Sequence, residues 1–359
     1  MTTDLSPRIR KLLRQDVQGM HAYAVQPSAG LVKLDAIENP HRLPAQLQRE
    51  LGERLGAVAL NRYPGDRVDT LRQALRQHAQ VPAGFDLMLG NGSDELISLL
   101  AMACDVPGAS ILAPVPGFVM YGMSAQLQGL RFIPVDLTAD FQLDERAMLA
   151  AIEREKPSIV YIAYPNNPTA NLWDDAAIDR IIAAAPGLVV IDEAYQPFAS
   201  RNYGQRIAKY EHVLLMRTLS KFGLAGVRIG YMVGPSALVA EVDKVRPPYN
   251  ISVLNCEAAL FALEHADVFE EQAAQLRQQR GLLLERLAAM PGVTPFPSDA
   301  NMILVRVPDP ARAFEGMKAR GVLVKNVSRM HALLAGCLRL TVGTTDENAQ
   351  MLAALQASL

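Results

Sequence analysis

Cysteine is scarce in this sequence of 359 residues. The three cysteines, Cys104, Cys256 and Cys337, have spacings that match no zinc or redox motif. A sparse, odd set also argues against a disulfide framework, so we expect buried, reduced thiols in a cytoplasmic protein. The six histidines show no i, i+4 pairing, and we expect none of them to bind a metal.

Long apolar runs and a strong net charge are missing as well. No segment approaches the roughly 18 apolar residues that a membrane-spanning helix needs, and the charged N-terminus has no apolar core of a secretory signal. The formal net charge is -2, and a nearly neutral chain gives no electrostatic indication that it binds nucleic acid or an anionic membrane. With 50% hydrophobic and 20% charged residues, the composition is typical of a globular protein, and a small-molecule substrate is favoured.

Short apolar segments, bounded by Gly, Pro or polar turns, recur over the first two thirds of the chain. They lie at 87–89, 110–113, 131–135, 158–163, 188–191, 213–216 and 229–233. Helical patterns, such as those at 145–155 and 174–185, separate several of them. Nearly all-apolar strands that alternate with helices predict an α/β fold whose mainly parallel sheet is covered by helices on both faces.

The pattern changes near residues 246–250, which read Arg-Pro-Pro-Tyr-Asn. A long helical stretch at about 255–290 follows, then strands at 302–307 and 338–342 with a helix between them. The length also favours two domains. We therefore expect an N-terminal arm at 1–43, a large domain at 44–250, and a smaller α+β domain at 251–359 to which the arm contributes.

Two polar motifs follow predicted strands in the first half of the chain. The segment Gly90-Asn91-Gly92-Ser93-Asp94 ends a strand and opens a helix, where free backbone N–H groups favour an anion; such glycines also serve tight connections that bind nothing. The segment 164–169, Tyr-Pro-Asn-Asn-Pro-Thr, holds two amides between prolines at a strand's carboxyl end, where ligands of open α/β sheets bind. On its own this segment favours a plain Asn-Pro turn.

Two further motifs carry charge. Asp192 directly follows a buried strand, and its carboxylate could bind Mg²⁺ or pair with a cationic ring nitrogen. No Gly-Lys-Ser/Thr phosphate loop supports a nucleotide. Lys221 follows another strand, between the hydroxyls of Thr218 and Ser220 and a turn that ends at Arg228. A lysine there can form an imine, and hydroxyls with an arginine suit a phosphate dianion.

Taken together, these motifs resemble those of the fold type I pyridoxal-phosphate aminotransferases, over essentially the whole chain. The resemblance rests on Asn-Pro-Thr at 167–169, Asp-x-x-Tyr at 192–195 and Ser-Lys…Arg at 220–228. Within that group the sequence is most similar to the histidinol-phosphate aminotransferases. The supporting segments are 60–65, 92–95, 217–221, 226–230 and 336–343.

This resemblance implies a set of roles around pyridoxal 5'-phosphate. Lys221 would hold the cofactor as a Schiff base and then move the proton between the substrate's Cα and the cofactor's C4′. Asp192 would pair with the pyridine nitrogen and keep it protonated. Tyr195 and Asn167 would hydrogen-bond to the ring's 3′ oxygen, and Phe118 would stack on the ring. The phosphate would lie among Ser93, Asp94, Thr218, Ser220 and Arg228.

The resemblance also implies a homodimer with shared active sites, in which Tyr63 reaches the cofactor phosphate of the other subunit. Arg339 would bind the anionic end of each substrate in turn, glutamate or histidinol phosphate. Tyr23, on the arm, would close over the imidazole. The implied reaction is transamination between L-histidinol phosphate and 2-oxoglutarate in histidine biosynthesis.

The sequence departs from the family pattern at three places. Lys325 stands where the family often has a second arginine, Phe118 where many relatives have tyrosine, and Ala170 where glycine is commoner. A lysine binds a phosphate as a single point charge, whereas an arginine can bind it with two parallel hydrogen bonds. Lys325 therefore leaves the identity of the substrate open. A threonine-phosphate decarboxylase or an aromatic amino acid aminotransferase of the same fold are therefore the alternatives. A non-catalytic binding protein would have no need for Lys221 and Asp192 together.

Overall fold

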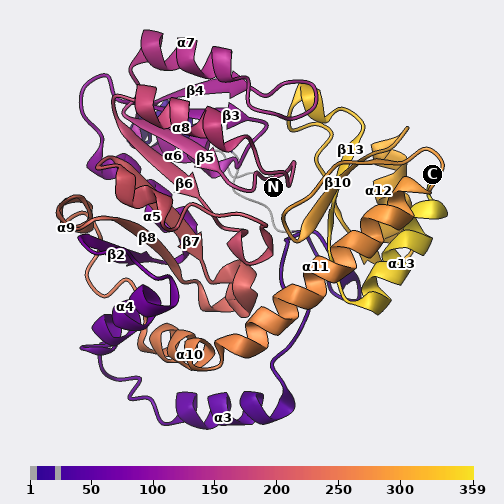
Figure 1. The fold of residues 1–359 in the computed structure, drawn as a ribbon, viewed down its shortest axis with the longest axis horizontal. Coiled ribbons are helices and arrows are strands. Elements are labelled where there is room, and N and C mark those ends of the chain that lie inside the picture. The colour runs from indigo at the N-terminus through magenta and orange to yellow at the C-terminus, as the bar shows by residue number, and fades with distance from the viewer. Residues whose placement is uncertain (1–5, 21–25) are drawn as a thin grey trace.

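The centre of the molecule is a sheet of seven strands, seen in the computed structural model, which describes residues 6–20 and 26–359 (Figure 1). The strands, in spatial order, are β2 (Phe85–Gly90), β8 (Gly230–Pro235), β7 (Val213–Thr218), β6 (Leu188–Asp192), β5 (Ile159–Ala163), β3 (Ser110–Val115) and β4 (Arg131–Asp136). The strands from β7 to β4 pair in parallel, and only β8 runs antiparallel to its two neighbours. The prediction of a mainly parallel α/β sheet is therefore confirmed.

Helices cover both faces of this sheet because its strands are apolar on both sides. In β3, Ile111 and Ala113 pack into one core cluster and Leu112 packs into another. Helices α5 (Gly92–Ala103), α6 (Met120–Gln128) and α9 (Ser236–Asp243) cover one face. Helices α4 (Arg67–His78), α7 (Glu145–Glu155), α8 (Asp175–Ala184) and α10 (Val253–Glu264) cover the other. Alternate side chains of one strand thus fill two cores, as in sheets buried on both faces.

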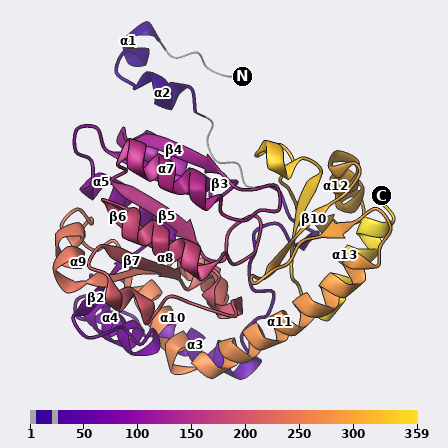
Figure 2. The ribbon, with the colours of Figure 1, turned by 45° about the horizontal axis from the view of Figure 1, so that its top comes forward.

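A second body with its own core lies beside the large sheet (Figure 2). Its antiparallel sheet has the order β12 (Lys325–Asn326), β13 (Cys337–Thr341), β10 (Met302–Arg306) and β9 (Thr294–Pro295). Helices α11 (Ala266–Ala288), α12 (Pro310–Ala319) and α13 (Thr345–Gln356) pack on it. A capping box between Thr344 and Glu347 begins α13 by satisfying backbone N–H groups of its first turn.

The helical stretch expected at about 255–290 consists of two helices, with a break at His265. Buried residues of α10, including Cys256 and Ala259, belong to the core of the large sheet, whereas Leu283 and Leu287 of α11 belong to the second core. Figure 1 shows α11 running from one body to the other. The domain boundary expected at residue 250 stays a prediction, and the chain crosses between the two cores within α11.

The N-terminal segment contacts both bodies. Two short helices, α1 (Pro7–Arg10) and α2 (Gln15–Gln18), begin it. Between them, the Arg14 guanidinium donates to the carbonyl of Leu127, near the end of α6, over 2.6 Å. Further along, β1 (Val32–Lys33) pairs in parallel with β11 (Val322–Leu323) of the second body. Helix α3 (Ala45–Gly56) then leads back to the large body. None of the described helices is long and apolar enough to cross a membrane.

Candidate active site

The predicted site residues gather at the carboxyl ends of β6 and β7. Asp192 is the last residue of β6, and Thr218 is the last residue of the neighbouring β7. Lys221 lies in the single π-helical turn, Ser220–Leu224, that follows β7. Parallel strands with both faces buried leave this edge as the place where polar side chains converge, as the sequence pattern predicts.

A close approach of backbone segments shapes the anion site next to this edge. Gly92, with φ 75°, begins α5, and a Cβ there would lie 2.6 Å from Nη2 of Arg228. A Cβ on Gly230 would lie 2.5 Å from the carbonyl carbon of Gly92. The two glycines therefore let the start of α5, with the backbone N–H groups of Ser93 and Asp94, face Arg228 across a narrow gap.

Hydroxyl groups complete this cradle. The Oγ1 of Thr218 lies 3.0 Å from the Oγ of Ser220, and the backbone N–H of Ser220 donates to Oγ1 of Thr218 over 3.1 Å. Nη1 of Arg228 lies 3.5 Å from the Oγ of Ser220, and its Nη2 lies 3.1 Å from a carboxylate oxygen of Asp94. One guanidinium, two hydroxyls and a helix N-terminus form a donor set for a phosphate dianion.

Lys221 has the environment of an imine-forming lysine. Its Nζ donates to the carbonyl of Ala36 over 3.1 Å. Burial, and after it the positive charge of Arg339, lower the pKa of Lys221 to about 8. A larger fraction of its amine is therefore neutral, and hence nucleophilic, near physiological pH than for a lysine in water.

Asp192 is a buried carboxylate, 4% exposed, with two hydrogen bonds. Oδ2 accepts from the hydroxyl of Tyr121 over 2.7 Å, and Oδ1 accepts from the backbone N–H of Ala194 over 3.0 Å. Burial raises the pKa of Asp192 to about 6, and these hydrogen bonds oppose that rise. Among the described residues no lysine or arginine forms an ion pair with it, so the carboxylate suits a cationic group of a ligand.

A hydrogen bond between Arg339 and Asn167 joins the two bodies. Nη1 of Arg339 in β13 donates to the amide oxygen of Asn167 over 2.8 Å. Burial raises the pKa of the Tyr195 phenol, and the positive charge of Arg339 and the side chain of Asn167 oppose that rise. Lys325 lies directly opposite Arg339 in the register of β12 and β13, so both cations belong to one face of the small sheet.

The aromatic residues predicted for the site differ in their surroundings. Phe118, between β3 and α6, is half-buried and meets Tyr121 edge to face at 5.7 Å between ring centroids. Tyr63 is 74% exposed and stacks on Tyr249 at 4.1 Å, away from any core. Tyr23 lies outside the described residues.

The structure adds residues that the sequence did not single out. Tyr121, on α6, bonds to Asp192 although 71 positions separate the two. Glu193 accepts from Nε and Nη2 of the buried Arg217 at 2.9 and 2.7 Å and so fixes the chain just beyond Asp192. The acidic pair at 192–193 was visible in the sequence, but nothing local marked Tyr121 or Arg217 as their partners.

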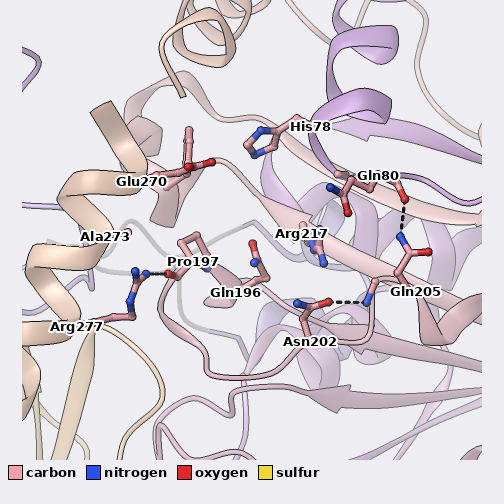
Figure 3. Close-up of a pocket in the computed structure, with 13 residues that line it drawn as sticks. His78, Gln80, Gln196, Pro197, Asn202, Gln205, Arg217, Glu270, Ala273 and Arg277 are labelled. Atoms are coloured by element: carbon pink, nitrogen blue, oxygen red, sulfur yellow. Dashed lines mark hydrogen bonds between the residues drawn. The ribbon is translucent and has the colours of Figure 1, made fainter. Parts of the chain in front are cut away.

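A cavity of about 390 Å³ lies apart from these residues, between α11 and the end of β7 (Figure 3). It is lined by side chains that include His78, Gln196, Glu270 and Arg277, with Arg217 at its base. Glu193 neutralises Arg217, and Arg277 donates to the carbonyl of Pro197 over 2.7 Å. The cavity contains none of the predicted cofactor or substrate residues.

Comparison with known proteins agrees with this geometry. Residues 30–355 match the family model "Aminotransferase class I and II". A relative described as histidinol-phosphate aminotransferase, from Polaromonas naphthalenivorans, is 72% identical over 99% of this chain and 98% of its own length. One with the same description, from Methylibium petroleiphilum, is 71% identical over 99% and 96%. The crystal structure of histidinol-phosphate aminotransferase from Sinorhizobium meliloti, in complex with pyridoxal-5'-phosphate, has a TM-score of 0.84 and 25% identity, covering 99% of this chain and 98% of that one.

Proposed function

The chain belongs to the class I and II aminotransferases, and we propose that it transfers an amino group between L-histidinol phosphate and 2-oxoglutarate. The products are imidazole acetol phosphate and glutamate, and the reaction belongs to histidine biosynthesis. The observation that carries the proposal is the 72% identity to a histidinol-phosphate aminotransferase over nearly the full length of both chains, in a molecule that keeps Lys221, Asp192 and Arg228 at one sheet edge.

Pyridoxal phosphate fits the residues at that edge. The cradle of Arg228, Ser220 and the α5 N-terminus suits its phosphate, the buried carboxylate of Asp192 suits its pyridinium nitrogen, and Lys221 suits its aldehyde. When bound, the cofactor supplies a protonated ring that stabilises negative charge at the substrate's Cα. Tyr195 and Asn167 would hydrogen-bond to the ring's 3′ oxygen, and Phe118 would stack on the ring.

Lys221 is the group that moves the proton. Since its pKa is lowered to about 8, its amine can accept the proton from the substrate's Cα once the amino group has been taken up. The carbonyl of Ala36 orients Nζ, and the neighbouring charge of Arg339 favours the neutral amine. The same amine would return a proton to C4′ of the bound cofactor, and hydrolysis by a water molecule would then release the oxo product and complete one half-reaction.

Arg339 and Lys325 are the proposed anion-binding pair for the substrates. Arg339 would hold the carboxylate of glutamate and the phosphate of histidinol phosphate in turn. Lys325, opposite it across β12 and β13, adds a second positive charge that a dianionic phosphate uses more fully than a carboxylate does. One pocket then serves two substrates in a ping-pong sequence. Tyr23 is proposed to close over the imidazole.

We also propose a cytoplasmic homodimer with shared active sites. Tyr63 and Tyr249 form an exposed aromatic stack, and Leu60, three residues before Tyr63, is 69% exposed. Exposed apolar side chains grouped in this way are typical of a surface that a second subunit covers. Tyr63 would then reach the cofactor phosphate of the partner. The three cysteines are free, in keeping with a reducing compartment.

The test is a titration of the purified protein with L-histidinol phosphate while the cofactor's visible absorbance is followed. Conversion of the cofactor to its amine form, reversed by 2-oxoglutarate, is the expected result. If the absorbance is indifferent to histidinol phosphate but responds to L-threonine phosphate or L-phenylalanine, the substrate assignment is wrong and the cofactor assignment stands. A protein that takes up no pyridoxal phosphate would overturn both.

A further inference from the structure

Tyr121 is the residue that holds the buried carboxylate of the site, although neither its motif nor its position in the chain assigns it that role. Its hydroxyl lies 2.7 Å from Oδ2 of Asp192, and both residues are buried, at 2% and 4% exposure. The other oxygen, Oδ1, is fixed by the backbone N–H of Ala194. A carboxylate with one donor on each oxygen has a defined plane, which a buried carboxylate without donors does not have.

The ring of Tyr121 is itself tightly placed. It stacks on Tyr161 of β5 at 4.3 Å between centroids, with 11° between the ring planes, and Phe118 meets it edge to face. Close packing of the ring on two sides leaves its hydroxyl little freedom to leave Asp192. Tyr121 thus connects Phe118, which we assign to the face of the cofactor ring, with Asp192, which we assign to the ring nitrogen.

We propose that Tyr121 is a positioning residue, whose hydroxyl keeps the carboxylate of Asp192 aimed and ionised for the protonated ring nitrogen of the cofactor. The inference rests on the proposed function, since that assigns Asp192 to the ring nitrogen. Asp94 and Glu193 add negative charge around Asp192, and burial disfavours its charged form. The hydrogen bond from Tyr121 opposes both effects, because a donor stabilises the charged form of a carboxylate.

The structure offers a matched control in Tyr161. Among the described residues no group hydrogen-bonds to the Tyr161 hydroxyl, although that hydroxyl is buried and its ring stacks on Tyr121. Tyr161→Phe therefore removes a buried oxygen from the same pair of rings without touching Asp192. Tyr121→Phe removes an oxygen of the same kind that does touch Asp192, so the two variants differ only in the interaction under test.

The probe is pyridoxamine 5'-phosphate, which keeps the ring nitrogen and the phosphate but has no aldehyde to react with Lys221. We expect Tyr121→Phe to raise its dissociation constant about tenfold, the usual effect of losing a hydrogen bond to a charged group. Tyr161→Phe is expected to change it less than about twofold. Equal dissociation constants for the two variants would overturn the proposal.

A double-mutant cycle separates positioning from a purely structural role. If Tyr121 acts through Asp192, then adding Tyr121→Phe to Asp192→Asn should weaken pyridoxamine phosphate binding by less than about twofold. A full tenfold loss in that background would show that Tyr121 acts by another route and would overturn the proposal. Thermal unfolding of each apoenzyme checks that the variants fold.

The pKa of Asp192 gives a second readout that needs no cofactor. The apoenzyme is labelled with ¹³C at the aspartate carboxyl groups, and the signal of Asp192 is identified by its loss in Asp192→Asn. The pKa read from this signal should be about one unit higher in Tyr121→Phe than in the native protein. Tyr161→Phe should leave the pKa of Asp192 unchanged, and an unchanged pKa in Tyr121→Phe would overturn the proposal.

The same probe separates this inference from the proposed function. If the native protein binds pyridoxamine phosphate but ignores histidinol phosphate, the proposed substrate fails while this inference holds. If the native protein binds no pyridoxamine phosphate, both fail.

Discussion

The cofactor side and the substrate side of the site are built differently. Apart from Tyr63, which is proposed to reach the partner's cofactor, the residues assigned to the cofactor end or follow strands β2, β3, β5, β6 and β7 of one sheet, or lie just ahead of β8. Those assigned to the substrate come from elsewhere: Arg339 and Lys325 from the four-stranded sheet of the second body, and Tyr23 from the arm. Hydrogen bonds from Arg339 to Asn167 and from Lys221 to the carbonyl of Ala36 join the two sides, and Tyr195 packs into the second core.

This difference separates what every substrate needs from what a particular substrate needs. A site on the edge of a single buried sheet has fixed geometry, and its residues act in both half-reactions. A substrate pocket made by a second body and an arm can change its residues while the sheet edge stays the same. Lys325, in place of the family's frequent arginine, is a change of the second kind. Substitutions on the cofactor side should therefore affect both half-reactions equally, whereas a substitution of Lys325 on the substrate side should affect them unequally.

The largest effect is expected for Lys221→Ala. With no amine to move the proton at Cα, both half-reactions should slow by about 10³-fold or more, measured as single turnovers with histidinol phosphate and with 2-oxoglutarate. Lys244→Ala serves as the control, since the Lys244 side chain is 65% exposed and its ion-pair partner among the described residues is Glu241, also on the surface. Unequal slowing of the two half-reactions would show that this cofactor-side residue does not act equally in both.

Smaller effects are expected on the substrate side, and only that of Lys325 should differ between the two substrates. Arg339→Gln should raise KM for both substrates about 100-fold, because a guanidinium that holds the anion is lost. Its bond to Asn167 is lost as well, so kcat should also fall. Lys325→Gln should raise KM about tenfold for histidinol phosphate and less for 2-oxoglutarate, since the dianion uses the second charge more fully. Equal KM changes for the two substrates in Lys325→Gln would contradict the assigned role.

The same division explains how far the sequence could predict the molecule. Strand–helix alternation with apolar strands predicted the seven-stranded sheet, and each motif after a strand placed its residue at the correct sheet edge, as with Asp192 and Lys221. These are local signals, since a strand's end fixes where the next few residues lie. The antiparallel direction of β8 and the break at His265 were not predicted, because both depend on packing against distant segments.

The contacts between the motifs were also beyond the sequence. The bond from Tyr121 to Asp192 spans 71 positions and that from Arg339 to Asn167 spans 172, and no periodicity encodes such a pairing. The cross-strand position of Lys325 beside Arg339 required the register of β12 and β13. The sequence was therefore enough to assign residues to a cofactor, but the partners that hold those residues in place could be recognised only in the fold.

The smallest expected effect concerns the stability that the apoenzyme loses by burying the carboxylate of Asp192 on the cofactor side. Burial raises the pKa of Asp192 from 3.8 to about 6. The folded state therefore keeps this proton up to a higher pH than the unfolded state does, so this group lowers the free energy of unfolding as pH rises from about 4 to about 6. The full deficit is present above about pH 6.

Asp192→Asn should remove that deficit. We expect it to raise the apoenzyme's free energy of unfolding by on the order of 2 kcal/mol at pH 8 and by about half as much at pH 5, measured by urea unfolding. With saturating pyridoxamine phosphate the order should reverse, because the ligand stabilises the native carboxylate form more. Lys325→Gln, on the substrate side, should show no such exchange of stability for binding. An Asp192→Asn apoenzyme that gains no stability between pH 5 and pH 8 relative to the native protein would show that this carboxylate is not held in a costly state for its ligand.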